Sequence, residues 1–153
     1  MSAGSDIRIE RFNPAMQDAF RTLVLNGMAE RWGVVDESLN ADLNDIDAHY
    51  DNDCVLVAVD GAMVVGTGIL LIREAEGEIV RMSTLRDYRR RGIARHILAQ
   101  LVRVAAEYGV KRIVVETNAK WIEARKLYEA FGFTFTHSTP GAFGRETFYE
   151  LLI

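Results

Sequence analysis

The middle of the chain carries the pattern that most limits its fold: a strand, a helix and a second strand in close succession. Residues 78–85 predict a strand, and residues 92–108 place apolar side chains along one helical face before Gly109 ends the helix. Residues 111–117 include Ile113-Val114-Val115 and predict another strand. Two strands joined through a helix form a crossover unit, which builds a parallel pair within a sheet.

Hairpin and helix patterns flank this crossover on both sides. Residues 55–60 and 62–72 are rich in β-forming residues and meet at Asp60-Gly61, a dipeptide typical of a tight turn with positive φ. Asn13-Pro14 predicts the start of a helix that Gly33 ends. The other predicted elements are strands at 6–11, 133–137 and 146–152, helices at 41–50 and at 121–131 before Gly132, and a loop at 138–144.

This order of elements predicts an α/β fold, an α+β mixed sheet with helices on both faces. No stretch of the chain has the composition of a linker, so we expect a single domain over residues 1–153. Residues 1–5 are expected to be untethered and flexible.

Composition narrows the class of protein further. The chain has 153 residues, of which 49% are apolar and 26% charged, ordinary values for a globular protein. No apolar run approaches the roughly 20 residues that span a bilayer, and we expect no secretory signal and no membrane partner. Cys54 is the only cysteine, so no intrachain disulfide can form and a cytoplasmic location is expected.

Charge is unevenly distributed around a formal net value of −4. Residues 36–53 hold seven acids and neither Lys nor Arg, whereas residues 81–95 hold six arginines against Asp87 alone. The two zones indicate two ligands, or one ligand with two ends. The alternative is that both are solvated faces.

The basic zone lies where the strand at 78–85 gives way to the central helix. A helix N-terminus exposes unpaired backbone N–H groups and partial positive charge, which suits a pyrophosphate. Arginines are unfavourable at a helix start unless an anion is present, and Arg89, Arg90 and Arg91 directly precede Gly92. Gly92 and the small Ala94 would let the backbone approach such an anion closely.

Three segments of the chain resemble the GNAT superfamily of N-acetyltransferases. Arg89-x-x-Gly92-x-Ala94 resembles the pyrophosphate-loop motif of that family, and residues 78–84 resemble its fourth strand. Residues 124–133, Ala-Arg-Lys-Leu-Tyr-Glu-Ala-Phe-Gly-Phe, resemble its downstream Leu-Tyr and Gly-Phe segment. The element order from residue 6 to 152 also matches. The resemblance implies a mostly antiparallel sheet of about seven strands, about four helices, and a parallel fourth and fifth strand splayed apart.

The resemblance also implies acetyl-CoA as co-substrate, with its pantetheine arm between the splayed strands. Backbone groups near Met82 and Thr84 would bind the arm, and the loop and first helical turn would bind the pyrophosphate. Many members carry an asparagine at the position of Trp121, so either Asn118 replaces it or Trp121 packs on the cofactor. The cofactor-binding residues so implied are Met82, Thr84, Arg89, Arg90, Arg91, Gly92, Ile93, Ala94, Arg95 and Asn118.

Acetyl transfer to an amine requires a general base, a polarised carbonyl and a protonated leaving thiolate. The resemblance implies Tyr128 as general acid and Glu78 as general base, with His137 as an alternative base. The structural alternatives are that Tyr128 only packs in the core and that Glu78 is an exposed acid at the end of its strand. Cys54 begins an apolar strand and is expected to be a buried hydrophobe. The histidines and cysteine show no metal-ligand spacing, so no metal is expected.

The acceptor region implied by the resemblance comprises residues 28–50 and 138–145, with Trp32 and Asp36 as substrate-binding residues. The acids of residues 36–53 favour a cationic amine acceptor, although they equally fit a solvated helix face. We therefore expect an N-acetyltransferase for a small-molecule or peptide amine that works by direct attack, and a homodimer is compatible with the family. A non-catalytic CoA sensor is the second reading. The net negative charge argues against nucleic acid as a partner.

Overall fold

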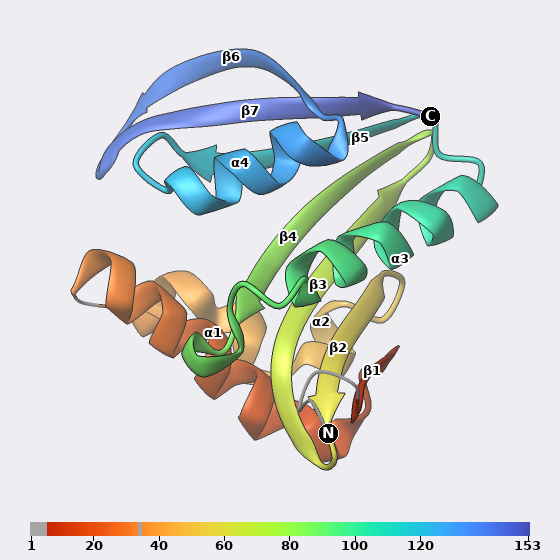
Figure 1. The fold of residues 1–153 in the computed structure, drawn as a ribbon, viewed down its shortest axis with the longest axis vertical. Coiled ribbons are helices and arrows are strands. Elements are labelled where there is room, and N and C mark those ends of the chain that lie inside the picture. Colours follow the sequence, from red (N-terminus) through yellow and green to blue (C-terminus); the bar gives the residue numbers. More distant parts are fainter. Residues whose placement is uncertain (1–5, 34) are drawn as a thin grey trace.

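A seven-stranded sheet runs through the protein in the order β1-β2-β3-β4-β5-β7-β6 (Figure 1). The computed structural model describes residues 6–33 and 35–153, so the expectation for residues 1–5 lies outside the described residues. All neighbouring strands pair antiparallel except β4 and β5, which are parallel as the crossover pattern predicted. The strands are β1 (Ile7–Arg11), β2 (Cys54–Asp60), β3 (Met63–Arg73), β4 (Glu76–Thr84), β5 (Arg112–Asn118), β6 (Thr134–Gly141) and β7 (Gly144–Leu152).

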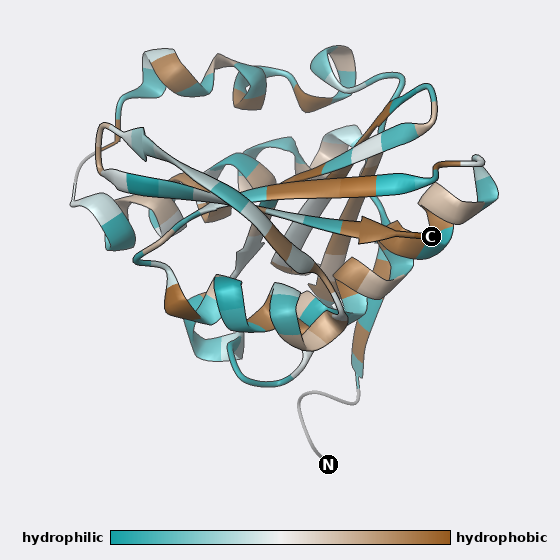
Figure 2. Ribbon diagram, turned by 90° about the horizontal axis from the view of Figure 1, so that it is seen from above, coloured by the Kyte–Doolittle hydropathy of each residue, from teal (hydrophilic) through white to brown (hydrophobic). Residues whose placement is uncertain are grey.

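Helices cover both faces of the sheet, as Figure 2 shows from above. One face packs against α1 (Gln17–Trp32), the 3-10 segment η3 (Glu37–Asn44) and the short α2 (Ile46–His49). The other face packs against α3 (Ile93–Glu107) and α4 (Ile122–Phe131). Two further 3-10 turns, η2 (Pro14–Met16) and η4 (Arg86–Tyr88), precede α1 and α3. The α/β prediction with a mixed sheet is confirmed.

Strand β2 shows why the centre of the sheet is apolar on both sides. Every residue from 54 to 59 is buried. Cys54, Leu56 and Ala58 pack in the core beneath α3 and α4, and the three intervening valines pack in the core beneath α1. Cys54 is 1% exposed, and burial raises the pKa of its thiol. Its prediction as a small buried hydrophobe is confirmed.

Glycines end three helices at the predicted positions. Gly33, Gly109 and Gly132 have φ values of 79°, 79° and 119°, the left-handed region in which a residue without a Cβ has no steric penalty. The Gly33 N–H donates to the Ala29 carbonyl, which closes the last turn of α1. These ends follow from local backbone preferences alone.

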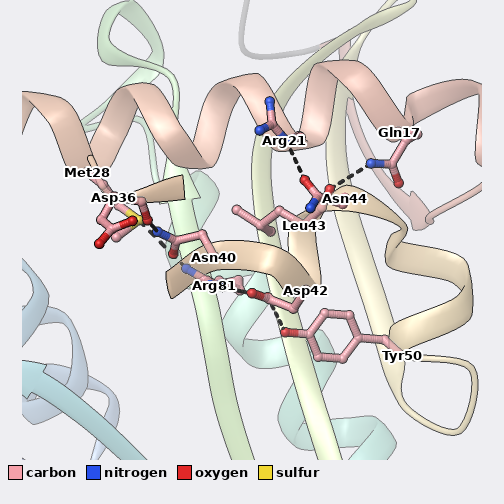
Figure 3. A network of polar contacts seen from close by, with 10 residues as sticks. All are labelled: Gln17, Arg21, Met28, Asp36, Asn40, Asp42, Leu43, Asn44, Tyr50 and Arg81. Carbon is pink, nitrogen blue, oxygen red and sulfur yellow. Dashed lines mark hydrogen bonds and ion pairs between the residues drawn. The ribbon is translucent and has the colours of Figure 1, made fainter. Parts of the chain in front are cut away.

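The predicted helix over residues 41–50 is wrong, because the segment is broken in two. Asn40 and Asp45 have non-helical backbone angles, and Asp45 accepts a hydrogen bond from the Ala48 N–H as the cap of α2. Gln17 of α1 donates to the Leu43 carbonyl (Figure 3), and it also accepts from the N–H of Ile46. This side chain satisfies the backbone groups that the break exposes, so contacts with α1 fix it.

Both predicted hairpin turns are shifted. The turn between β2 and β3 consists of Gly61 and Ala62, since Asp60 pairs with Met63, and only Gly61 has positive φ. The predicted loop at 138–144 is mostly strand, because β6 continues to Gly141, which pairs with Gly144. Pro140 is tolerated there because β6 is an edge strand. None of the helices within the described residues is long and apolar enough to cross a bilayer.

Candidate active site

Strands β4 and β5 pair over only part of their length. Their parallel ladder runs from Glu76 opposite Arg112 to Ile79 opposite Val115, and both strands continue beyond it. Figure 1 shows the two strands diverging from the end near the C-terminus. Beyond Ile79, the edge of β4 that faces β5 therefore has no strand partner, and its backbone groups are available to a ligand.

A bulge at Arg81 marks the place where β4 turns away. Arg81 has φ of 57°, uncommon for a residue with a side chain, and the register between β3 and β4 shifts here. The Thr67 hydroxyl donates to the Arg81 carbonyl at 2.8 Å and holds the backbone in this conformation. Strained backbone of this kind persists where surrounding contacts fix it, often at functional sites.

The Arg81 side chain is fixed by a polar network with η3 and α2 (Figure 3). Its Nη2 and Nε donate to the two carboxylate oxygens of Asp42 at 2.7 and 3.0 Å, and the Tyr50 hydroxyl donates to Asp42 at 2.5 Å. Burial alone would raise the pKa of Asp42, but the hydrogen bonds from Arg81 and Tyr50 outweigh it and hold the pKa below its ordinary value. Arg81 is thus neutralised within the protein.

A cavity of about 540 Å³ lies between the diverging strands, and we call it the first cavity. Its walls comprise residues 79–84 of β4, residues 115–117 of β5, Arg31 of α1, and Trp121 with four residues of α4 that include Tyr128. Its far end is formed by Arg89, Arg90, Gly92, Ala94 and Arg95. Met82 and Thr84 line it as predicted, so most of the expected cofactor-binding residues surround one elongated space.

At the turn before α3, the helix N-terminus has no side-chain hydrogen-bond partner among residues 6–33 and 35–153. Gly92 caps α3 with φ of 79°, no side chain accepts from the first-turn N–H groups, and the first turn holds no acid. An ideal Cβ built on Gly92 meets nothing within 4 Å, so the glycine is required for its backbone conformation. Unpaired amides at the start of a 15-residue helix form a site that favours an anion.

The arginines of this turn have different partners. Arg89 pairs with Glu30 of α1 at 2.9 Å and donates to the Thr84 carbonyl, so its charge is partly compensated. Arg90 has φ of 65° and lines the cavity, whereas Arg91 stacks over the Tyr88 ring outside it. Ile93 faces the core. The Arg91 and Ile93 side chains therefore point away from the first cavity, and only their backbone groups, through which the turn is expected to bind the pyrophosphate, belong to it.

Tyr128 lies at the inner end of the first cavity. It is 4% exposed and packs edge-on against Phe133 at 5.6 Å between ring centroids. Burial raises its pKa, and the nearby Arg31 guanidinium opposes that shift only in part. Its hydroxyl is therefore protonated at neutral pH, the state that a proton donor requires.

Two buried polar atoms on the wall of the first cavity have no hydrogen-bond partner within the described residues. They are the Thr117 Oγ1 and the indole Nε1 of Trp121. Buried donors without partners are uncommon in proteins and cost roughly 1–3 kcal/mol each. Both residues line the first cavity, but these two atoms are themselves shielded by their neighbours, so a ligand in the cavity does not reach them in this conformation.

A second cavity of about 620 Å³ opens on the other side of β4. It is lined by residues 78–81 of β4, by Glu116 of β5, by Leu71 and Arg73 of β3, and by η3 and α2 side chains that include Tyr50. Residues 79–81 and Glu116 line both cavities. The two spaces therefore adjoin at the bulge, with these four residues between them.

Glu116 is a candidate functional residue that the sequence did not single out. Burial, followed by the charges of Glu146 and Glu78, raises the pKa of its carboxyl. Glu78, the predicted general base, lines only the second cavity. The alternation of residues in β5 could have identified Glu116 from the sequence. Ile113 and Val115 face the core, so Glu116 faces the opposite side of the sheet. Glu78 lies on that same side.

Most acids of the run at 36–53 are used within the protein. Asp36 and Asp45 cap η3 and α2, Glu37 pairs with Arg21, Asp42 pairs with Arg81, and Asp53 accepts from the Ile72 N–H. Asp36 lines neither cavity. Only Asp42 and Asp53 of this run line the second cavity, and both are already hydrogen-bonded.

Trp32 and Asn118 also lie away from the cavity walls. Trp32 stacks on Trp121 and Phe143 at 5.1 and 4.8 Å between ring centroids, and so contacts a cavity residue without lining the cavity. Asn118 is buried and donates to Glu146 and to the Phe143 carbonyl. The alternative position, Trp121, does line the first cavity. His137 stacks on Phe148 and lines neither cavity.

Comparisons with known proteins agree with this geometry. A family model described as the acetyltransferase (GNAT) family matches residues 16–133. The chain is 36% identical over 81 residues to the uncharacterized N-acetyltransferase YsnE of Bacillus subtilis, covering 51% of this chain and 54% of that protein. It is 34% identical over 117 residues to N-acetylaspartate synthetase of Danio rerio, covering 70% of this chain and 42% of that protein. The chain thus spans about half or less of the length of these relatives.

Solved structures share the whole fold at low sequence identity. An acetyltransferase of the GNAT family from Staphylococcus aureus Mu50 superposes with a TM-score of 0.84 at 21% identity, covering 95% of this chain and 98% of that one. YncA of Salmonella typhimurium, solved with its cofactor acetyl-CoA, superposes with a TM-score of 0.78 at 18% identity, covering 95% and 93%. By its match to the family model over most of its length, the chain belongs to the acetyltransferase (GNAT) family.

Proposed function

We propose that the protein transfers the acetyl group of acetyl-CoA to a primary amine of a small molecule or peptide, by direct attack in a ternary complex. The observation that carries this proposal is the meeting of the two cavities at residues 79–81 and Glu116. One cavity ends at an anion-binding helix start, and the other carries unpaired carboxylates. An acyl donor and an amine acceptor could therefore meet at one point.

The donor site would be formed by this chain's own backbone and arginines. The amides from Arg89 to Ala94 would hold the pyrophosphate, with Arg90 adding charge on the cavity wall. The unpartnered edge of β4 near Met82 and Thr84 would bind the pantetheine amides. When bound, acetyl-CoA supplies an activated acetyl thioester. The protein's contribution is to orient that thioester toward the junction of the cavities.

The acceptor would bind in the second cavity, and Glu116 would act as the general base. An amine enters as an ammonium ion at neutral pH and must lose a proton before its nitrogen can attack. The raised pKa of Glu116 brings its basicity closer to that task than an ordinary carboxylate. Glu78, on the same side of the sheet, would attract the ammonium ion, and it remains the alternative base.

Tyr128 would act as the general acid. The attack forms a nitrogen–carbon bond and breaks the carbon–sulfur bond, so the proton leaves the nitrogen while the departing sulfur gains one. Tyr128 is protonated and lines the first cavity, which suits it to give its hydroxyl proton to that sulfur. An ammonium ion loses two protons in all. Glu116 would release the first to solvent and then accept the second from the attacking nitrogen, and solvent would reprotonate Tyr128 after it has given its proton to the sulfur.

An assay with acetyl-CoA and a panel of primary amines tests the proposal. The panel would comprise polyamines, amino acids and peptides with free N-termini, and release of free CoA thiol would be followed with a thiol-reactive dye. We expect amine-dependent thiol release, and a rise in thermal stability with CoA alone. At a CoA concentration about 100 times the dissociation constant, the stabilisation is about 2.7 kcal/mol.

The outcomes separate the two functions that the sequence left open. CoA binding combined with no thiol release for any amine would favour the non-catalytic CoA sensor. Absence of CoA binding at millimolar concentration would overturn both readings. Acetylation confined to polyamines or lysine-like side chains would support the cationic acceptor, whereas activity on acidic amino acids alone would exclude it.

A further inference from the structure

Arg31, in the last turn of α1, carries a positive charge that no carboxylate of the described chain neutralises. None of the ion pairs within residues 6–33 and 35–153 includes it, and the adjacent Glu30 pairs with Arg89 instead. Its guanidinium lies 4.4 Å from the centroid of the Trp121 ring. An aromatic face attracts a cation without cancelling its charge, so Arg31 can still bind an anion.

The guanidinium lies at the opening between the diverging strands. Arg31 lines the first cavity together with Val24 and Met28, and their spacing places the three side chains on one face of α1. Trp121, which the guanidinium contacts, is the N-cap of α4. The two helices cover opposite faces of the sheet and flank the divergence of β4 from β5 in Figure 1. Contact between them is possible here because the β4–β5 ladder has already ended at Ile79.

The same guanidinium lies near the proposed proton donor, Tyr128. Both residues line the first cavity, and each changes the pKa of the other. Part of the Arg31 side chain is exposed, yet burial is the largest influence that lowers the pKa of its guanidinium, followed by the charge of Arg89. The charges of Tyr128 and Glu30 act in the opposite direction. An arginine stays protonated even so, and a full positive charge therefore lies within electrostatic reach of the Tyr128 hydroxyl.

The other charged side chains of this cavity are paired, lie at the far end or carry the opposite charge. Arg81 and Arg89 each form an ion pair with an acid. The acids on the cavity walls would repel an anion near Tyr128. Among the described residues, Arg31 is the cation that acts on Tyr128. The remaining charged residues that line the cavity are Arg90 and Arg95 at the start of α3, and Glu116 and Glu123.

Transfer of an acyl group from a thioester places negative charge next to the proton donor. When the amine nitrogen bonds to the carbonyl carbon, the carbon–sulfur bond breaks and its electron pair goes to the sulfur. The sulfur is anionic until it takes the Tyr128 hydroxyl proton, while Glu116 accepts the proton of the nitrogen. A fixed positive charge stabilises such an anion more in a partly buried cavity than in water.

We propose that Arg31 is a catalytic residue, whose guanidinium stabilises the negative charge on the departing sulfur of CoA. This inference rests on the proposed function and adds to it a group that acts before proton transfer from Tyr128 is complete. Arg31 itself neither gives nor takes a proton. The contact with Trp121 holds the guanidinium at the opening, so the charge is already in place when the carbon–sulfur bond breaks.

The thiol pKa of bound CoA tests the proposal without any acetyl transfer. A free thiol ionises at about pH 8.5. If the Arg31 guanidinium lies beside the sulfur, the thiol of CoA bound to the wild type should ionise about one pH unit below that of free CoA. Ultraviolet absorbance of the thiolate through a pH titration would measure this shift. Complexes with desulfo-CoA, which lacks the sulfur, give the background absorbance of the protein's tyrosines.

Three variants separate the charge of Arg31 from its packing. Arg31→Met keeps a long side chain against the Trp121 ring and removes the charge, so the thiol pKa of bound CoA should rise by about one unit relative to the wild-type complex. Arg31→Lys keeps the charge in a different shape and should give a value between the two. Arg103→Met is the control, because Arg103 is exposed on α3 and lines neither cavity. It should leave the thiol pKa unchanged.

Initial rates at saturating substrate concentrations give a second readout. Arg31→Met should lower kcat about 10-fold, the rate equivalent of one unit of pKa. Its affinity for desulfo-CoA should stay within about twofold of the wild type, because the sulfur is absent from that ligand. A residue that only packs against Trp121 would instead lower the affinities for CoA and desulfo-CoA equally and leave the thiol pKa unchanged. If urea unfolding shows that Arg31→Met does not fold, Arg31→Gln is measured by the same criteria.

The outcomes distinguish this inference from the proposed function. A wild type that does not bind CoA overturns the proposed function and the inference together. A wild type that binds CoA, with the same thiol pKa in the Arg31→Met complex, overturns the inference alone. An unchanged thiol pKa with a raised KM for carboxylate-bearing acceptors also overturns it and assigns Arg31 to the acceptor. A thiol pKa as high in Arg31→Lys as in Arg31→Met overturns it as well, because the charge would then not be the cause.

Discussion

The two cavities lie on either side of β4 and differ in how their charges are balanced. The first ends at a cluster of arginines of which only Arg89 forms an ion pair, and its walls are largely apolar. The second contains the neutralised pair of Arg81 with Asp42, while Glu78 and Glu116 form no ion pair with a described residue. The arginines of the turn before α3 thus line the first cavity alone and Glu78 lines the second alone, whereas Glu116 lines both.

This difference separates charges that hold the fold from charges that await a ligand. The sequence alone does not distinguish the two kinds of charge. In the acidic run at 36–53, most acids cap helices or pair with arginines. The fold places the start of α3 and its arginines on the first cavity, Glu78 on the second, and Glu116 on both. Four substitutions test this division, taken in order of decreasing effect.

The largest expected effect is at Tyr128. Replacement by Phe removes the proposed proton donor and should lower kcat by about 10²–10⁴-fold, with CoA affinity unchanged within about twofold. Initial-rate assays at saturating substrate concentrations would measure kcat, and calorimetric titration would measure the affinity for CoA. Tyr108→Phe makes the same chemical change on an exposed tyrosine at the end of α3 and should be silent. A kcat within about threefold of the wild type would remove Tyr128 from the mechanism.

Glu116→Gln should lower kcat/KM for the amine about 100-fold at neutral pH, because no base remains at the junction of the cavities. The loss should shrink as the pH rises and the amine deprotonates in solution. In the wild type, the acid limb of the pH profile should fall above the ordinary glutamate pKa of 4.5, since the pKa of Glu116 is raised. Glu78→Gln is the matched variant on the same side of the sheet.

The comparison of the two glutamates decides which one is the base. A larger loss for Glu78→Gln would restore the interpretation made from the sequence. The free energy of unfolding gives an independent test of the raised pKa of Glu116. A carboxyl with a raised folded pKa stabilises the protein fully below its ordinary pKa and loses that contribution as the pH rises through the folded pKa. Glu116→Gln should therefore unfold no earlier than the wild type at pH 7.

Asp42→Asn should destabilise the protein by about 2–3 kcal/mol at pH 7 while leaving the first cavity intact. The substitution leaves Arg81 without its charge partner, and the two side chains are only 13% and 19% exposed. Urea unfolding would measure it. The folded pKa of Asp42 lies below 3.8, so its contribution is present above pH 3.8 and is lost as the pH falls through the folded value.

The difference in the free energy of unfolding between the wild type and Asp42→Asn should accordingly become smaller in strong acid. Asp36→Asn is the control, because asparagine caps a helix as well as aspartate does. Equal stability of Asp42→Asn and wild type at pH 7 would contradict the role of the Asp42 network in holding the bulge.

The smallest effect, and the most specific, concerns Gly92. Gly92→Ala and Gly109→Ala alter residues at opposite ends of α3 with the same φ of 79° and the same open space around the added methyl. Each should cost about 1 kcal/mol of stability. Only Gly92→Ala should also weaken CoA binding, by about 10-fold, because its methyl meets the pyrophosphate. Equal CoA affinities would argue against the helix start as the phosphate site.

Features with local causes could be predicted from the sequence, and features with distant causes could not. The helix ends at Gly33, Gly109 and Gly132 depend on the backbone freedom of one residue. The break at Asp45 depends on Gln17, far away in the chain. The first cavity was largely anticipated through Gly92 and its arginines. Glu116 was missed, because a single glutamate on a strand has the same local pattern whether it faces solvent or a cavity.

Arg81, the residue of β4 with left-handed backbone angles, changes the face of the sheet to which the following side chains point. An uninterrupted strand places alternate residues on one face, so Val80 and Met82 would point the same way. Here Val80 packs in the core beneath α1, Met82 packs in the core beneath α3, and Ser83 reaches Gly27 of α1. The extra residue at Arg81 resets the alternation, which lets one continuous strand present even-numbered side chains first to the α1 side of the sheet and then to the α3 side.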